Sequence, residues 1–138
     1  FESNDEITHL LDEFIKNKFH FPPLGKKWFE TSKDRVQWNL EFSLSKNMYH
    51  GYDEWSEKKA KRLVDLLIES LDKEARFFSN VQDGTFFMYS RRNDPRGSLQ
   101  EYGVIAYDKK RIFGVWISQH YDPHVICIDI DKLNESLK

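Results

Sequence analysis

The first hydrophobic pattern along the chain has a helical period. Five apolar residues recur at i, i+3, i+4, i+7 and i+8: Ile7, Leu10, Leu11, Phe14 and Ile15. This spacing predicts one apolar stripe on a helix from about Asn4 to Lys18. Ser3 and Glu6 have the spacing of a capping box at its start, and Pro22 and Pro23 prevent the helix from continuing.

Two further patterns occupy the middle of the chain. Residues Arg35 to Leu44 alternate strictly between apolar and polar, which predicts a strand with one buried and one wet face. A second helix is predicted from about Asp53, its expected N-cap, to Glu74. Its buried stripe is expected to contain Ala60, Leu63, Val64, Leu66, Leu67, Ile68 and Leu71. Its solvated side is expected to carry Lys58, Lys59, Lys61 and Arg62.

The rest of the chain has the pattern of a strand meander. Short aromatic or β-branched runs bounded by turn residues predict strands at 85–91, 101–107, 111–118 and 125–130, and residues 131–138 have the pattern of a short terminal helix. We therefore expect one α+β domain over residues 1–138. Its antiparallel sheet of about five strands should pack on one face against two main helices.

Composition narrows the function classes. The 138 residues contain 39% hydrophobic and 32% charged residues with a net charge of −2, which argues against a general nucleic-acid binder. A single cysteine, Cys127, excludes an internal disulfide, and its apolar neighbours predict an inert thiol packed in the core. No stretch is long and apolar enough for a membrane helix, and a reducing, cytoplasmic location is expected.

One cluster has metal-ligand chemistry. His120, Asp122, His124, Asp129 and Asp131 are close together in the sequence, and imidazoles with carboxylates can form a metal shell. His120 and His124 have helical spacing, but Pro123 disfavours a helix there. A polar connection between strands, with Asp131 as a helix cap, is the simpler interpretation. A small metal-dependent hydrolase or nuclease using this cluster remains an alternative.

Basic clusters interleaved with rings suggest a second alternative, a single-stranded nucleic-acid module. The basic residues are Lys58 to Arg62, Arg91, Arg92, Arg96 and Lys109 to Arg111, and the rings that could stack on bases are Tyr89, Tyr102 and Trp116. In a meander the loop after Arg91 and the turn at Lys109 lie at opposite ends of the sheet. The clusters therefore need not form one groove.

Acidic residues form two groups that could make one anionic patch. Asp5, Glu6, Asp12 and Glu13 fall on the first helix, and Asp129, Asp131 and Glu135 lie near the C-terminus. Such a patch would suit a basic protein partner, with exposed rings such as Phe19 and Phe21 as anchors. We expect reversal of Asp12 and Glu13 to Lys to slow association and to leave the fold intact.

Part of the chain resembles the immunity proteins of bacterial contact-dependent growth inhibition systems. The resemblance covers about residues 55–118: Trp55 near the start of a long helix, followed by the ring-rich runs 84–89, 102–107 and 112–117. It implies a cytoplasmic, non-enzymatic protein that occludes the active site of a cognate toxin, often a nuclease. We accordingly predict a protein-binding domain with no cofactor, no metal and no catalytic residue, whose partner is a basic toxin.

Overall fold

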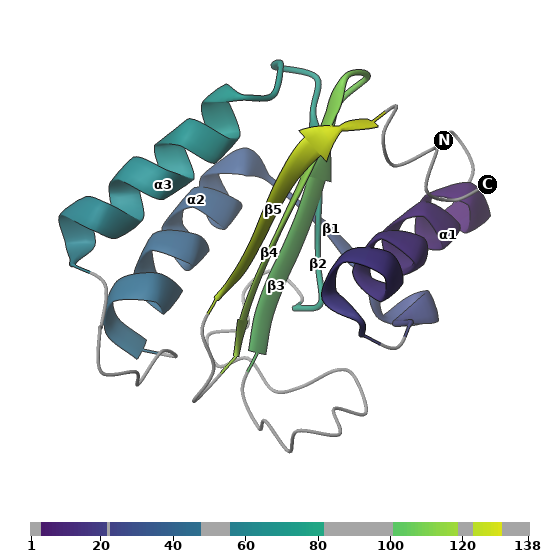
Figure 1. Ribbon diagram of the computed structural model, residues 1–138, viewed down its shortest axis with the longest axis horizontal. Coiled ribbons are helices and arrows are strands. Elements are labelled where there is room, and N and C mark those ends of the chain that lie inside the picture. The colour runs from purple at the N-terminus through teal and green to yellow at the C-terminus, as the bar shows by residue number, and fades with distance from the viewer. Residues whose placement is uncertain (1–3, 22, 48–55, 82–100, 119–122, 131–138) are drawn as a thin grey trace.

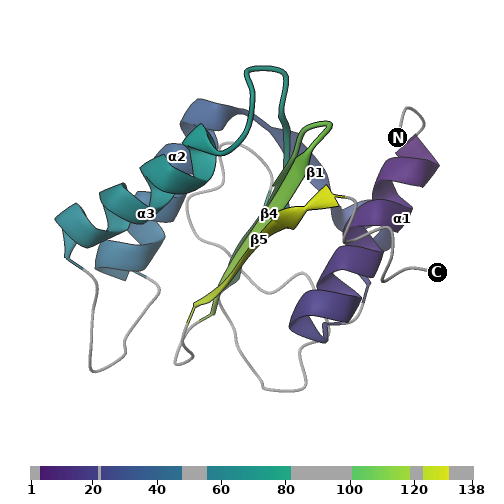
Figure 2. The ribbon, with the colours of Figure 1, turned by 45° about the horizontal axis from the view of Figure 1, so that its top comes forward.

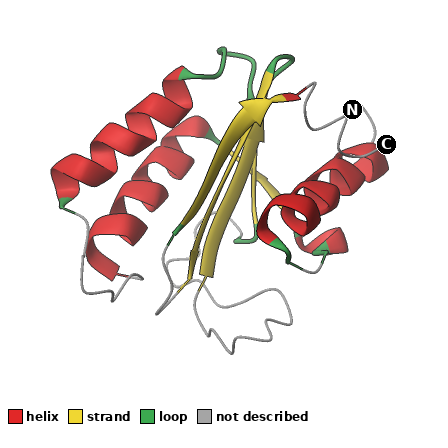
Figure 3. Cartoon of the chain, in the orientation of Figure 1, coloured by secondary structure: helices red, strands yellow, loops and turns green. Residues whose placement is uncertain are grey.

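A computed structural model describes residues 4–21, 23–47, 56–81, 101–118 and 123–130. The helices are α1 (Asn4–Phe14), α2 (Lys33–Phe42) and α3 (Glu57–Glu69), with π-helical turns at Ile15–Phe19 after α1 and Ser43–Asn47 after α2, and a 3₁₀ turn at Gly25–Lys27. The strands are β1 (Phe29–Thr31), β2 (Arg76–Ser79), β3 (Glu101–Tyr107), β4 (Arg111–Ser118) and β5 (His124–Asp129). Figure 3 separates the two classes by colour.

The five strands form one antiparallel sheet in the order β1-β2-β3-β4-β5. This confirms the predicted α+β class. The predicted strands 101–107 and 111–118 have the observed bounds, and the last strand begins and ends one residue earlier than predicted. Strands β1 and β2 were not predicted. Both are short, at three and four residues, and give too few positions for a period to be recognised.

Helices cover both faces of the sheet, so the prediction that they cover one face is wrong. α1 packs on one side, and α2 and α3 pack side by side on the other (Figures 1 and 2). Two separate cores result, because alternate residues of each strand point to opposite layers. In β4, for example, Ile112 and Trp116 belong to the α1 core, whereas Phe113 and Val115 belong to the core beneath α2 and α3.

Helix α1 has the predicted apolar stripe. Its five members are all at most 4% exposed: Ile7, Leu10, Leu11 and Phe14 in α1, and Ile15 at the start of the π-helical turn. The stripe meets the sheet where Gly114 lies under the rings of Phe14 and Phe19. The π-helical turn ends at His20, whose backbone is left-handed (φ 60°), and this residue reverses the chain into Phe21.

The predicted strand at 35–44 is wrong, because Lys33–Phe42 is helix α2. The Ser32 hydroxyl caps this helix by accepting a hydrogen bond from Arg35 N at 3.3 Å. Val36, Leu40 and Leu44 satisfy an i, i+4, i+8 pattern as well as the alternating one, and all three are fully buried. A strand would have buried Trp38 and Phe42 on the same face, whereas the helix turns Trp38 outward, where it is 54% exposed.

Helix α3 is shorter than predicted. It begins at Glu57 with Ser56 as the N-cap, whose hydroxyl accepts from Lys59 N at 3.1 Å, and it ends at Glu69. Ala60, Val64, Leu67 and Leu71 form its buried side as expected, and the basic residues 58, 59, 61 and 62 are exposed. Leu66 was expected in the buried stripe but is 61% exposed.

Several predictions fall on residues outside the described part of the chain. These are the Ser3 cap, the Asp53 cap, the strand at 85–91 and the terminal helix at 131–138. Within the described ranges, no helix has the length and apolar character needed to cross a bilayer.

Candidate partner-binding surface

The predicted acidic residues do not gather into one patch among the residues that the structure describes. Asp5 and Glu6 are exposed in the first turn of α1. Asp129 is exposed on β5, where it lies 3.7 Å from Arg111 Nε. In the β4–β5 register Asp129 pairs with Arg111, two residues from Phe113, so it faces the α2–α3 layer, not the α1 layer. Asp131 and Glu135 lie outside the described residues.

Asp12 has a structural use. Its Oδ1 accepts hydrogen bonds from Leu24 N at 2.9 Å and from Trp28 Nε1 at 2.8 Å, and its Oδ2 accepts from Gly25 N at 3.2 Å. The carboxylate therefore ties α1 to the segment that leads into β1. These hydrogen bonds argue against the expectation that Asp12 can be reversed without affecting the fold. Glu13 differs, since its Oε2 accepts an exposed, 3.4 Å hydrogen bond from Asn17 Nδ2, one helical turn away.

The rings expected to anchor a partner beside α1 are buried. Phe19 is 4% and Phe21 is 6% exposed, and both contact the ring of Trp116. His124 packs against the same two phenylalanines, with ring centroids 5.7 and 5.6 Å away. This aromatic cluster belongs to the α1 core and offers no anchor at the surface.

The structure does not bring together His124 and Asp129, the two described residues of the metal-site alternative. His124 and Asp129 stand at opposite ends of β5, five residues apart, which is about 16 Å along a strand. Their odd and even positions also place the two side chains on opposite faces. They cannot share one coordination shell, and among the described residues no group of three potential ligands comes together. His120, Asp122 and Asp131 are outside the described ranges.

Two other expectations fail because of position in the sheet. Cys127 is exposed instead of packed in the core, because β5 is an edge strand that α3 does not fully cover; its sulfur lies 3.9 Å from Ser70 Oγ. Tyr102 and Trp116, the proposed base-stacking rings, are 1% and 0% exposed. With helices on both faces, these two rings cannot reach a nucleic acid. Tyr89, Arg91, Arg92 and Arg96 are outside the described residues.

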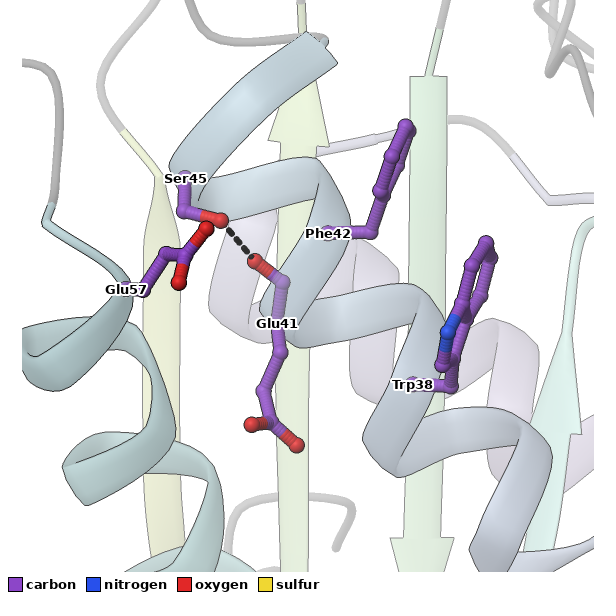
Figure 4. Close-up of a pocket in the computed structure, with 5 residues that line it drawn as sticks. All are labelled: Trp38, Glu41, Phe42, Ser45 and Glu57. Atoms are coloured by element: carbon purple, nitrogen blue, oxygen red, sulfur yellow. Dashed lines mark hydrogen bonds between the residues drawn. The ribbon is translucent and has the colours of Figure 1, made fainter.

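The structure brings together a different surface on α2 and α3. Trp38 and Phe42 stand one turn apart on the outer side of α2 with their rings parallel, 5.1 Å between centroids and 8° between planes. Beside them is an open pocket of about 220 Å³, which we call the α2–α3 pocket (Figure 4). Its lining residues are Trp38, Glu41, Phe42, Ser45 and Glu57.

One hydrogen bond joins the two helices beside the α2–α3 pocket, from Gln37 Nε2 to Asp65 Oδ1 at 3.1 Å. Within the α2 segment, Ser45 Oγ donates to the Glu41 carbonyl at 2.6 Å. Lys61 Nζ lies 3.1 Å from Asp65 Oδ2, and this hydrogen bond, with the nearby charges of Asp65, Glu41 and Glu69, raises the pKa of Lys61. Glu41 and Glu57 line the pocket, and Asp65 beside it is hydrogen bonded to Lys61.

Sequence reasoning missed this pocket because it depends on the period chosen for residues 35–44. If residues 35–44 form a helix, the buried stripe consists of Val36, Leu40 and Leu44. Trp38 and Phe42 then form an i, i+4 pair outside that stripe. That pattern was visible in the sequence. The pairing with Glu57, fifteen residues beyond Phe42, was not, since it depends on the packing of α3.

Comparisons with known proteins give no relative from which the role of this surface could be inferred. No family model, no curated protein and no solved structure matched the chain.

Proposed function

We propose that this protein is a non-enzymatic binding domain that neutralises a bacterial toxin in the cytoplasm by occluding a basic active site. The observation that carries the proposal is the exposed Trp38, stacked on Phe42 and bordered by Glu41 and Glu57. The choice of a toxin as the partner rests on the resemblance of residues 55–118 to immunity proteins.

The exposure of Trp38 is not explained by packing of the core, because the side chain is 54% exposed. Trp38 and Leu66 are the large apolar side chains that stay exposed in the described residues, at 54% and 61%. Leu66 is a single aliphatic group, which is ordinary at a protein surface. Trp38 lies beside a second ring and two carboxylates, and tryptophan is among the residues enriched at the energetic centres of interfaces.

The acids give the surface its specificity. Nuclease active sites carry basic residues that bind phosphates, and carboxylates can occupy those same residues with charge-assisted hydrogen bonds. Glu41 and Glu57 come from different helices, so the surface offers two acids in a fixed relation. Complementary charge of this kind raises association rate and selectivity more than affinity, which the rings supply.

Co-expression tests the proposal. The protein encoded beside this chain is produced in a bacterial host with and without the chain, and growth and complex formation by size-exclusion chromatography are measured. We expect the neighbour to arrest growth, wild-type chain to restore it, and a Trp38→Ala/Glu41→Lys variant to fail while remaining folded. A harmless neighbour, or rescue without a complex, would overturn the proposal.

A further inference from the structure

We infer that the α2–α3 pocket receives an arginine side chain of the partner protein. This inference rests on the proposed function, since it names the group by which a basic partner would be recognised. It is supported by three features of the pocket, namely its size, its aromatic wall and its charge.

The size of the pocket suits one long side chain. A volume of about 220 Å³ holds about seven water molecules at roughly 30 Å³ each. It is below the roughly 300 Å³ at which pockets for small molecules and cofactors begin. Its open form also allows entry by a group that projects from a larger surface.

The aromatic wall favours a planar cation. Figure 4 shows the rings of Trp38 and Phe42 standing together on one side of α2. A guanidinium group is flat and weakly hydrated, so it stacks on indole, the best of the aromatic acceptors, at little desolvation cost. An ammonium group is a compact and strongly hydrated charge, and it cannot form the same stack.

The charge of the pocket completes the match. Glu41 lines the pocket from α2 and Glu57 from the first turn of α3, and a carboxylate binds guanidinium through two parallel hydrogen bonds. Lys61, whose pKa the charge of Glu41 helps to raise, is hydrogen bonded to Asp65. Lys58, Lys59 and Arg62 are exposed on α3. These cations weaken the attraction for a second positive charge, so binding must depend on the stack as well as on the acids.

Three capped tripeptides test the inference directly. Acetyl-Gly-Xaa-Gly-amide is titrated into the full chain with Xaa as arginine, lysine or citrulline, and the indole N–H resonance of Trp38, assigned with Trp38→Phe, is followed by NMR. Arginine and lysine share a charge, whereas citrulline keeps the shape of arginine and is neutral. We expect a saturable shift with arginine, at least fivefold weaker binding of lysine, and no binding of citrulline.

Two variants provide the controls. Glu41→Gln/Glu57→Gln should weaken arginine binding at least fivefold, and Leu66→Ala, which truncates an exposed apolar side chain outside the pocket lining, should leave it unchanged. Equal binding of lysine, or no shift with any of the three peptides, would overturn the inference. A toxin complex that needs Trp38 while the peptides show no preference for arginine would leave the proposed function standing and refute only the arginine site.

Discussion

The indole N–H of Trp28 donates a 2.8 Å hydrogen bond to the carboxylate of Asp12, sixteen residues earlier in the chain. The same carboxylate accepts from the backbone of Leu24 and Gly25. One acidic side chain thus fixes the path from α1 into the first strand. Gly25 itself has a left-handed backbone (φ 62°), and the bond from its N–H helps to hold that conformation.

Replacing Asp12 should therefore cost stability. Asp12→Ala leaves the half-buried indole donor and two backbone donors without this acceptor, and the net contribution of a hydrogen bond to a charged group is about 1.5–3 kcal/mol. Because the site is only half-buried, water can take the place of the lost acceptor in part. We expect a loss of about 2 kcal/mol in the free energy of unfolding, measured by urea denaturation. Glu13→Ala, one residue along the same helix, is the control and should change it by less than about 0.5 kcal/mol. Equal effects of the two substitutions would contradict the bracing role of Asp12.

Asp108 makes the stability depend on pH. Burial raises the pKa of Asp108, but hydrogen bonds from the backbone N–H groups of Arg111, Asp72 and Lys110 outweigh it, so that its pKa lies below the ordinary value. A depressed pKa in the folded state adds stability above the pKa of the unfolded chain, about 3.9, and this stability is lost as the pH falls through the folded value.

The measurement compares wild type with Asp108→Ala from pH 7 to pH 2. We expect a difference of about 1–2 kcal/mol in the free energy of unfolding at neutral pH, from the lost hydrogen bonds of the β3–β4 turn. The difference should stay constant down to about pH 5 and shrink below pH 4. A difference that grows on acidification would have the wrong sign and would refute this account.

Gly103 should tolerate no side chain. It pairs with Trp116 across the β3–β4 ladder, and a Cβ at position 103 would clash with Cε3 of the Trp116 ring. Because Trp116 is fully buried among other rings, it has little room to move. We expect Gly103→Ala to destabilise the fold by about 3 kcal/mol, at the upper end for overpacking. A melting temperature within about 2 °C of wild type would contradict this packing.

The exposed edge of β5 can be probed through Cys127. An exposed thiol should react with a maleimide in the native protein, without denaturant. We expect one label per chain, attached at a rate close to that measured in urea. Labelling that occurs only after unfolding would place Cys127 in the core, as its apolar neighbours in the sequence suggested.

The elements that could be predicted are those whose patterns fit one period only. Residues 101–107 and 111–118 are continuous β-branched and aromatic runs around a three-residue turn, and they are strands as predicted. Residues 35–44 fit both periods, since Val36, Leu40 and Leu44 are spaced by four as well as by two. Tertiary packing against α3 decides between the helical and the strand period. The local sequence pattern holds no information about that packing.

The same limit applies to function. The acids of α1 were visible as charges, but the use of Asp12 depends on partners twelve to sixteen residues away. The alternating pattern of residues 35–44 predicts that Trp38 is buried. The α2–α3 pocket, which needs an exposed Trp38, could not be predicted from that pattern. The residues at the surface are determined by the fold. A wrong secondary-structure prediction for one element therefore also gives a wrong prediction of the exposed residues and of any site that they form.

Trp38 should matter little to stability. It is 54% exposed, and its stack on Phe42 is an i, i+4 contact worth about 0.5 kcal/mol. Trp38→Ala should therefore unfold within about 1 kcal/mol of wild type, whereas Trp116→Ala should lose about 3–5 kcal/mol. A large loss with Trp38→Ala in urea denaturation would mean that the ring serves the core.

The affinity of single variants for the neutralised toxin tests the central claim most directly. Isothermal titration calorimetry compares wild type, Trp38→Ala and Leu66→Ala, which each truncate a large apolar side chain that is exposed on one of two neighbouring helices. If the α2–α3 pocket is the binding surface, Kd rises by about 30-fold or more for Trp38→Ala, as at an interface hot spot, and stays within about twofold for Leu66→Ala. An unchanged Kd for Trp38→Ala would place the interface elsewhere and contradict the account.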